Sequence, residues 1–130
     1  MPVRGIRGAT SVDQDNRTEI AQATRELLTT ISQANPDLRK EDIASVLFTV
    51  TSDLTSDYPA RAARELGWVE VPLLCALEIP VPESLPKCIR VLIHWNTKLP
   101  QSAVRHVYLR KAAQLRPDLS LDMKGDNLNV

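Results

Sequence analysis

The sequence predicts a single α+β domain in which a mixed β-sheet carries one long and one short helix. Two apolar, β-rich runs at 71–79 and 87–95 surround a proline-rich turn, and we expect them to form neighbouring strands. A third apolar run spans 43–50, and a long amphipathic pattern precedes it. Strands and helices in this order are typical of helices laid on one sheet.

The first half of the chain is expected to form a strand, the long helix and a central strand. Residues 3–10 have the composition of a strand. Asn16 and Glu19 are spaced as a helix cap, and apolar residues recur at helical spacing over 20–34 before an Asn-Pro-Asp sequence ends the helix. The run 43–50 is apolar at consecutive positions, which is typical of a strand covered on both faces.

The second half contains a short helix and one ambiguous segment. Pro59 and Gly67 bracket a two-turn helix, because proline favours the first helical position and glycine the position after the last. Residues 99–102 form a turn or a short helix. The segment 104–116 fits a helix loosely, but a short strand at 107–109 is equally compatible with the sequence.

We expect residues 1–121 to form one domain and residues 122–130 to form a flexible C-terminal tail, which has too little apolar content to pack firmly. One layer of helices leaves the other sheet face bare, although the runs 43–50 and 87–95 are apolar on both faces. Oligomerisation is the simplest way to cover that face.

Composition excludes several classes of protein. The chain has 16 basic and 16 acidic residues, which argues against nucleic-acid binding driven by bulk charge. No apolar run is long enough to cross a membrane, and the N-terminal residues do not resemble a signal peptide, so we expect a cytoplasmic protein. Cys75 and Cys88 are then expected to be free thiols, and no spacing of cysteine and histidine suggests a metal site.

Glu78 and Arg90 each interrupt an apolar run, where a charge is unfavourable unless it is paired or used. One interpretation is that they form an ion pair with each other. The other is that both face a polar ligand. Together with Arg90, further fixed cations and a phenol occupy positions near turns and could bind a small dianion: Arg7, Arg64, Tyr108 and Arg116. The alternative for Arg7 and Arg64 is that they are ordinary surface residues.

Five sequence blocks in order resemble the small monofunctional chorismate mutases of the trimeric pseudo-α/β-barrel class, and the resemblance covers nearly the whole chain. The blocks are 4–10 (RGIRGAT), 75–78 (CALE), 87–91 (KCIRV), 105–109 (RHVYL) and 115–119 (LRPDL). The resemblance implies a homotrimer with active sites in the clefts between subunits. It also implies a cofactor-free Claisen rearrangement of chorismate to prephenate, at the branch towards phenylalanine and tyrosine.

The resemblance also implies roles for particular residues. Arg90 matches the cation at the ether oxygen and a substrate carboxylate, and Arg7 matches the arginine that holds a carboxylate. Glu78 and Cys75 match the pair that meets the ring hydroxyl. The remaining matches line the pocket (Tyr108 and the backbone from Leu74 through Cys75, Ala76 and Leu77 to Glu78), form a mobile loop at its mouth (Tyr58, Arg61, Arg64) or lie near the site (Leu115, Arg116).

This chain departs from the family pattern at three positions. Tyr58 stands where the family often has phenylalanine, Arg61 where it has lysine, and Leu74 where it has threonine, so a side-chain contact at Leu74 is in doubt. Cys75 and Glu78 would point to opposite faces of a straight strand. If both contact one ligand, the strand must be irregular at Ala76 or Leu77.

Two other functions fit the same residues. A trimeric deaminase of reactive imines would also use an interfacial arginine and an acid, but its rate would follow a titrating group. A non-catalytic metabolite-binding protein could keep the same pocket without turnover.

Overall fold

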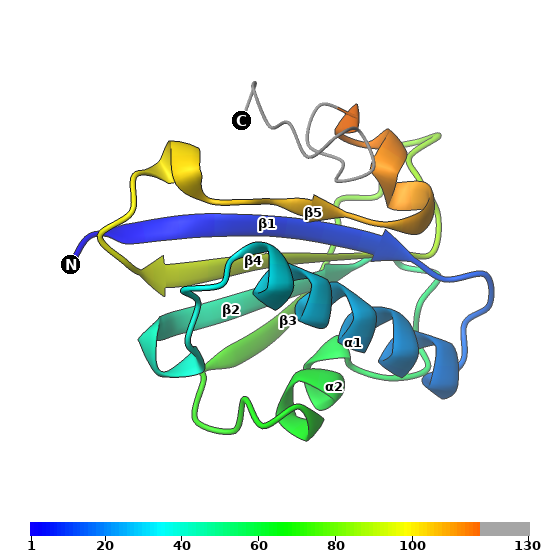
Figure 1. Ribbon diagram of the computed structural model, residues 1–130. Coiled ribbons are helices and arrows are strands. Elements are labelled where there is room, and N and C mark those ends of the chain that lie inside the picture. Colours follow the sequence, from blue (N-terminus) through cyan, green and yellow to red (C-terminus); the bar gives the residue numbers. More distant parts are fainter. Residues whose placement is uncertain (118–130) are drawn as a thin grey trace.

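The computed structural model describes residues 1–117 of the 130-residue chain. Its helices and strands are β1 (Val3–Ser11), α1 (Arg17–Ala34), β2 (Ile43–Val50), α2 (Pro59–Glu65), β3 (Leu73–Leu77), β4 (Cys88–Asn96) and β5 (Val107–Tyr108), with the 3₁₀ helices η1 (Lys40–Asp42), η2 (Gln101–Ala103) and η3 (Arg110–Gln114). Within the described range these strands form one mixed sheet, in the order β3-β2-β4-β1-β5 (Figure 1). The predicted α+β fold is therefore confirmed.

Local signals in the sequence set the bounds of α1. The side chain of Asn16 accepts a hydrogen bond from the amide of Glu19 at 2.8 Å, which confirms the predicted cap. At the other end, the buried side chain of Asn35 donates to the carbonyl of Ile31 and to the carbonyl of Arg105, both at 2.9 Å. The end of α1 is thereby joined to the segment that enters β5.

The predicted adjacency of the strands at 71–79 and 87–95 is wrong. β2 lies between β3 and β4, pairing in parallel with β3 and antiparallel with β4. The segment that contains α2 is long enough to return the chain for a parallel pairing on the outer side of β2. β2 is therefore an interior strand, as predicted, and β3 lies at the edge of the sheet.

The segment that was ambiguous in the sequence contains both kinds of structure. Val107 and Tyr108 form the short strand β5, which pairs in parallel with Gly8 and Ala9 of β1. The chain then continues into η3 rather than into an α-helix.

Both α-helices lie on the same face of the sheet, below it in Figure 1. The main core forms between them and the sheet, where the buried residues of α1 meet alternate residues of β1, β2 and β4. The fit is close at Gly8, since a Cβ there would lie 2.9 Å from Cδ1 of Ile31 and 3.0 Å from Cγ1 of Val91.

Within residues 1–117, the opposite face of the sheet is covered at one end only. There Ala9, Cys88, Tyr108 and Ala112 form a second, smaller cluster beneath η3. The rest of this face, which we call the open face, carries half-exposed side chains of β1, β2 and β4. The predicted flexible tail at 122–130 and the end of the predicted domain at residue 121 lie outside the described residues. Among residues 1–117, no helix is both long and apolar enough to span a bilayer.

Candidate active site

The open face brings together side chains that lie far apart in the sequence. Alternation along the strands aims Arg7 of β1, Arg90 of β4 and Tyr108 of β5 towards this face, and Glu78 joins them directly after β3. These four side chains share one open pocket with a volume of about 200 Å³. The pocket is completed by Gly8, Leu47, Thr49, Val91 and Leu92.

The carboxylate of Glu78 is held by two neighbours within this pocket, which we call the cationic pocket. The hydroxyl of Thr49 donates a hydrogen bond to Oε2 of Glu78. Nε of Arg90 lies 3.5 Å from the same oxygen. The interpretation of Glu78 and Arg90 as an ion pair is therefore confirmed. Both side chains also face the pocket, and the binding of a polar ligand there stays a prediction. The side chain of Arg90 remains 47% exposed, so its guanidinium is accessible to a bound anion.

The thiols are unsuited to nucleophilic chemistry. Burial raises the pKa of Cys75 above its ordinary value, and the nearby Arg64 only partly opposes this effect. Burial also raises the pKa of Cys88, against the influence of Arg90 beside it. Both groups are therefore neutral thiols near pH 7, whereas the reactive form of cysteine is the thiolate. Among the described residues, no group of three His, Cys, Asp or Glu side chains is placed to hold a metal ion.

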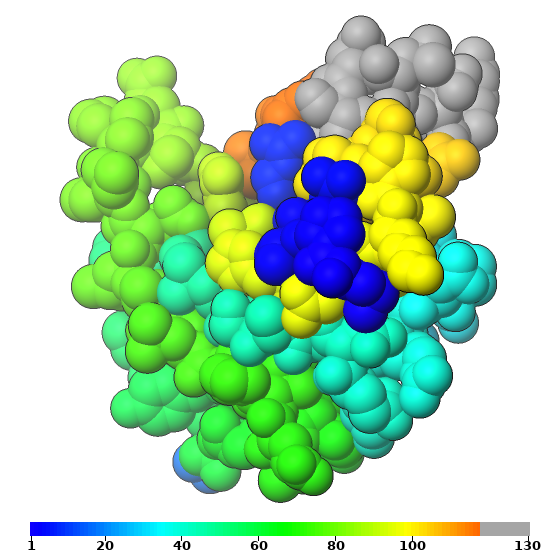
Figure 2. Space-filling view, turned by 90° about the vertical axis from the view of Figure 1, so that its left-hand side faces the viewer, coloured from blue at the N-terminus to red at the C-terminus, as the bar shows by residue number. Residues whose placement is uncertain are grey.

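A second cavity, which we call the edge pocket, lies at the edge of β3. It has a volume of about 550 Å³, and its lining includes Tyr58, Arg61, Cys75, Ala76 and Leu77. A different hollow appears in Figure 2, on the open face, between blue β1 and the projecting yellow-green segment after β3.

The predicted irregularity at Ala76 or Leu77 is absent. β3 pairs with β2 in unbroken register from Leu73 to Leu77, and the amide of Glu78 still donates to the carbonyl of Val50 at 2.9 Å. The regular strand sends Cys75 to the helix side of the sheet and Glu78 to the open face. One copy of the chain therefore does not bring these two side chains to the same pocket.

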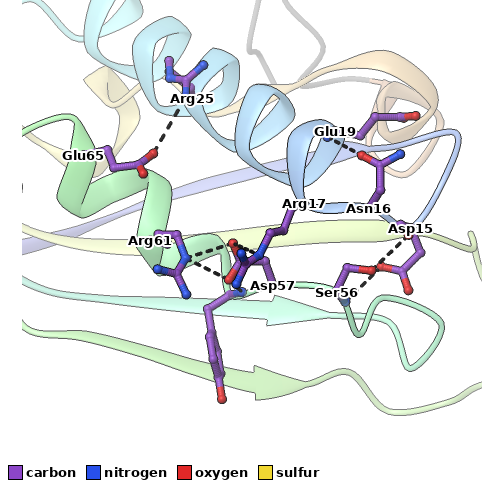
Figure 3. Close-up of polar contacts among 10 residues, drawn as sticks. Asp15, Asn16, Arg17, Glu19, Arg25, Ser56, Asp57, Arg61 and Glu65 are labelled. Carbon is purple, nitrogen blue, oxygen red and sulfur yellow. Dashed lines mark hydrogen bonds and ion pairs between the residues drawn. The ribbon is translucent and has the colours of Figure 1, made fainter.

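The loop before α2 is tied to the start of α1 (Figure 3). Asp57 accepts hydrogen bonds from Nε of Arg61 at 3.0 and 2.9 Å, and Nε of Arg17 lies 3.7 Å away. Asp15 accepts from the amide of Ser56 at 3.1 Å and from the amide and hydroxyl of Thr55.

These contacts lower the pKa of both aspartates. Although burial opposes the change, hydrogen bonds from the loop lower the pKa of Asp15, and the Tyr58 amide and the Arg61 guanidinium lower that of Asp57. Arg61 is thereby held at the mouth of the edge pocket. The side chain of Tyr58 itself is 64% exposed.

The other predicted site residues fall into two groups. Arg64 is exposed on α2 and close enough to Cys75 to influence its pKa, and Leu74 is exposed on β3. Leu115 packs against the small cluster that contains Tyr108, and Arg116 lies close enough to His106 to lower its pKa. The first pair lies near β3, and the second lies near Tyr108 and His106 but is not part of the lining of the cationic pocket.

The structure adds residues that the sequence reasoning missed. Thr49, Leu47 and Leu92 line the cationic pocket. His106, which is only 2% exposed, accepts a hydrogen bond at Nδ1 from the amide of Arg7 at 2.9 Å. Alternation within the strands could have indicated which side chains share the open face. The register that aligns Thr49 with Arg90 depends on long-range pairing, which the sequence does not reveal.

The cationic pocket combines guanidinium groups, one carboxylate and a phenol. This combination is typical of an enzyme that binds a small anion and acts through electrostatic stabilisation. Comparison with known proteins identifies the family. Residues 3–119 match the family model "Chorismate mutase type I". The chain belongs to the type I chorismate mutase family. It is an enzyme of that kind, which converts chorismate to prephenate in aromatic amino acid biosynthesis.

The relatives cover nearly the whole chain. Chorismate mutase AroH of Thermus thermophilus is 60% identical over 117 residues, which are 90% of this chain and 96% of that protein. Chorismate mutase AroH of Bacillus subtilis is 48% identical over 122 residues, 93% of this chain and 95% of that protein. A solved chorismate mutase from Clostridium thermocellum superposes with a TM-score of 0.82 at 45% identity, covering 85% of this chain and 97% of the other.

Proposed function

We propose that this chorismate mutase works as a homotrimer in which each active site joins the cationic pocket of one copy to the edge pocket of the next. The observation that carries the proposal is the grouping of Arg7, Glu78 and Arg90 in one pocket on a sheet face that the helices leave open. Cys75 and Arg61 line a different pocket of the same chain. A second copy is needed for the two sets to meet one substrate.

The surface around β3 supports an interface between copies. Large apolar side chains are exposed there in a continuous stretch of sequence: Leu74 (67%), Leu77 (69%), Ile79 (78%) and Val81 (58%). Apolar surface of this kind on a soluble domain marks an association site. β3 is also an edge strand, and an interface would shield its unpaired backbone groups.

In the proposed mechanism, Arg90 stabilises the charge that develops during the rearrangement. Breaking the C–O bond leaves partial negative charge on the ether oxygen, so a guanidinium N–H at that oxygen binds the transition state more strongly than the substrate. Glu78 holds Arg90 by their ion pair. Loss of one preorganised donor of this kind costs about 3–4 kcal/mol in the barrier.

The other residues hold the substrate in its reactive, folded conformer, which is a positioning effect. Arg7 binds a carboxylate, and Glu78 together with Cys75 of the neighbouring copy meets the ring hydroxyl. The walls and mouth of the site are proposed to comprise Tyr108, Leu115 and Arg116 from one copy, with Tyr58, Arg61, Arg64 and the backbone of Leu74, Ala76 and Leu77 from the next. The reaction in this form uses no cofactor, and we place the enzyme in the cytoplasm, which cell fractionation would test.

Subunit mixing tests the shared site. One variant, Arg90→Ala, disables the cationic pocket, and a second, Arg61→Ala with Arg64→Ala, weakens the edge pocket. In a mixed trimer of the two variants, about one site in three would join an intact cationic pocket to an intact edge pocket. Co-expression with different affinity tags should therefore restore up to about one third of the wild-type activity, whereas each variant alone stays weak.

The outcomes separate the alternatives. Mixed trimers without restored activity would show that each site belongs to one copy. A monomer by light scattering would contradict the proposal as a whole. Failure of the purified wild-type protein to consume chorismate would instead favour a binding protein that kept the pocket.

A further inference from the structure

The buried imidazole of His106 occupies a position in the sheet where a backbone carbonyl would normally lie. β5 pairs with β1 only at Gly8 and Ala9, and the ladder stops before Arg7. The amide of Arg7 donates instead to Nδ1 of His106 at 2.9 Å. The ring nitrogen therefore extends the pairing by one residue, at the residue whose side chain enters the cationic pocket.

The backbone on either side of His106 is fixed. The side chain of Asn35 accepts from the amide of Arg105 and donates to its carbonyl, both at 2.9 Å. On the other side, Val107 and Tyr108 pair with β1. An imidazole held at both ends and 2% exposed has little freedom to move. It can transmit that rigidity to Arg7.

The acceptor role requires a neutral ring. Because Nδ1 accepts a hydrogen bond, the proton of the neutral imidazole is on Nε2. Burial, together with the charges of Arg7 and Arg116, lowers the pKa of His106 to about 4. The ring therefore adds no further cation beside these arginines near neutral pH.

We propose that His106 is a positioning residue for the mutase reaction, which holds Arg7 at its place in the cationic pocket by accepting a hydrogen bond from its main-chain amide. The proposal rests on the proposed role of Arg7 in binding a substrate carboxylate. His106 does not line the pocket and acts only through Arg7. It is more than a core residue, since the bond it makes is to the backbone of a binding residue.

Three substitutions of His106 separate the hydrogen bond from the volume of the ring. In His106→Asn the side-chain oxygen can lie where Nδ1 lies, so the acceptor is kept. In His106→Leu a methyl group occupies that position, and the Arg7 amide loses its partner. In His106→Gln the amide group reaches the position of Nε2, so a polar group is kept but displaced.

The kinetic expectation follows from misplacement of Arg7. We expect kcat/KM within about threefold of wild type for His106→Asn, and a loss of about tenfold or more for His106→Leu and His106→Gln, because misplacing a binding group by about 1 Å can cost up to 10²-fold. The loss should fall on the same parameter, kcat or KM, that Arg7→Ala changes. In the Arg7→Ala background, His106→Leu should have almost no further effect.

The double-mutant cycle distinguishes the possible failures. If Arg7→Ala alone leaves the activity unchanged, the proposed role of Arg7 is wrong. If Arg7→Ala lowers activity but the effect of His106→Leu simply adds to it, His106 is only structural and the inference is overturned. If His106→Leu does not fold, the same cycle with His106→Gln decides, and wild-type kinetics in that variant would overturn the inference.

Discussion

Acidification should destabilise this protein well above the pH at which its carboxylates are protonated, and His106 is the reason. The ring is 2% exposed, and its pKa falls from an ordinary 6.5 to about 4 in the folded chain. Between these values the unfolded chain binds a proton that the folded chain excludes. The stabilisation is therefore complete above about pH 6.5, is lost progressively as the pH falls from about 6.5 to about 4, and is absent below that.

The magnitude follows from the size of this change. One pKa unit corresponds to about 1.4 kcal/mol, so the full contribution of the neutral ring is about 3 kcal/mol. About 2 kcal/mol of that should disappear between about pH 7 and pH 4.5. Asp15 and Asp57 have pKa values below 3.8, so the stability they contribute is present throughout this window and is lost only at lower pH.

Urea unfolding of the wild type and of His106→Asn at several pH values and one fixed protein concentration is the suitable assay. A fixed concentration is needed because the unfolding of an oligomer depends on it. The free energy of unfolding of the wild type should fall on acidification, and that of the variant should change by about 2 kcal/mol less. Parallel curves for the two proteins, or a wild-type curve that is flat over the window, would refute the reasoning.

The remaining predictions concern the site, the core and the loop. Arg90→Lys should fold but lose about 10²–10³-fold in kcat, because an ammonium lacks the guanidinium fork. The wild-type kcat should be nearly independent of pH around neutrality, since the rearrangement needs no proton transfer. Gly8→Ala should lower the free energy of unfolding by about 1–3 kcal/mol, because its Cβ would lie 2.9 Å from Cδ1 of Ile31. Asp57→Asn should raise KM by about fivefold or less, because it weakens the ion pair that joins the buried Asp57 carboxylate to the half-exposed Arg61.

Each of these predictions has a contradicting result. Near-wild-type turnover by Arg90→Lys would remove that residue from the central role. A steep rate change with a midpoint near neutrality would favour proton-transfer chemistry of the deaminase kind. An unchanged free energy of unfolding of Gly8→Ala, measured by chemical denaturation, would show that the core adjusts to the added methyl group and would contradict the predicted clash. For Asp57→Asn the matched control is Glu65→Gln, which breaks the exposed pair with Arg25, and an equal change in KM would exclude a specific role for the loop.

Local chemistry made the helices predictable. The cap of α1 depends on two residues three positions apart, and Pro59 sets the start of α2 through its fixed backbone angle. Strand order was not predictable in the same way. The runs that became β3 and β4 are adjacent in sequence, but β2 inserts between them because α2 supplies the crossover for a parallel pairing.

The site was predictable in composition but not in arrangement. The charges of Glu78 and Arg90 are conspicuous in apolar runs, and family resemblance supplied their roles and that of Arg7. Alternation implied that Cys75 and Glu78 point to opposite faces of a straight strand, but the irregularity predicted at Ala76 or Leu77 to bring them together was wrong, because β3 keeps a regular register. Thr49 could not be found from sequence, because its hydroxyl meets Glu78 only through the long-range pairing of β2 with β3.

The open face connects the stability of the fold to its chemistry. An ion pair between Arg90 and Glu78 with partly exposed side chains contributes little to the stability of one copy. In the proposed trimer a neighbouring copy excludes water from these charges, and their interaction strengthens because the local dielectric falls. The hydroxyl of Thr49 holds the Glu78 carboxylate, and that carboxylate in turn orients Arg90. In the proposed mechanism, substrate meets a guanidinium whose orientation is already set, so little reorganisation remains for the reaction itself.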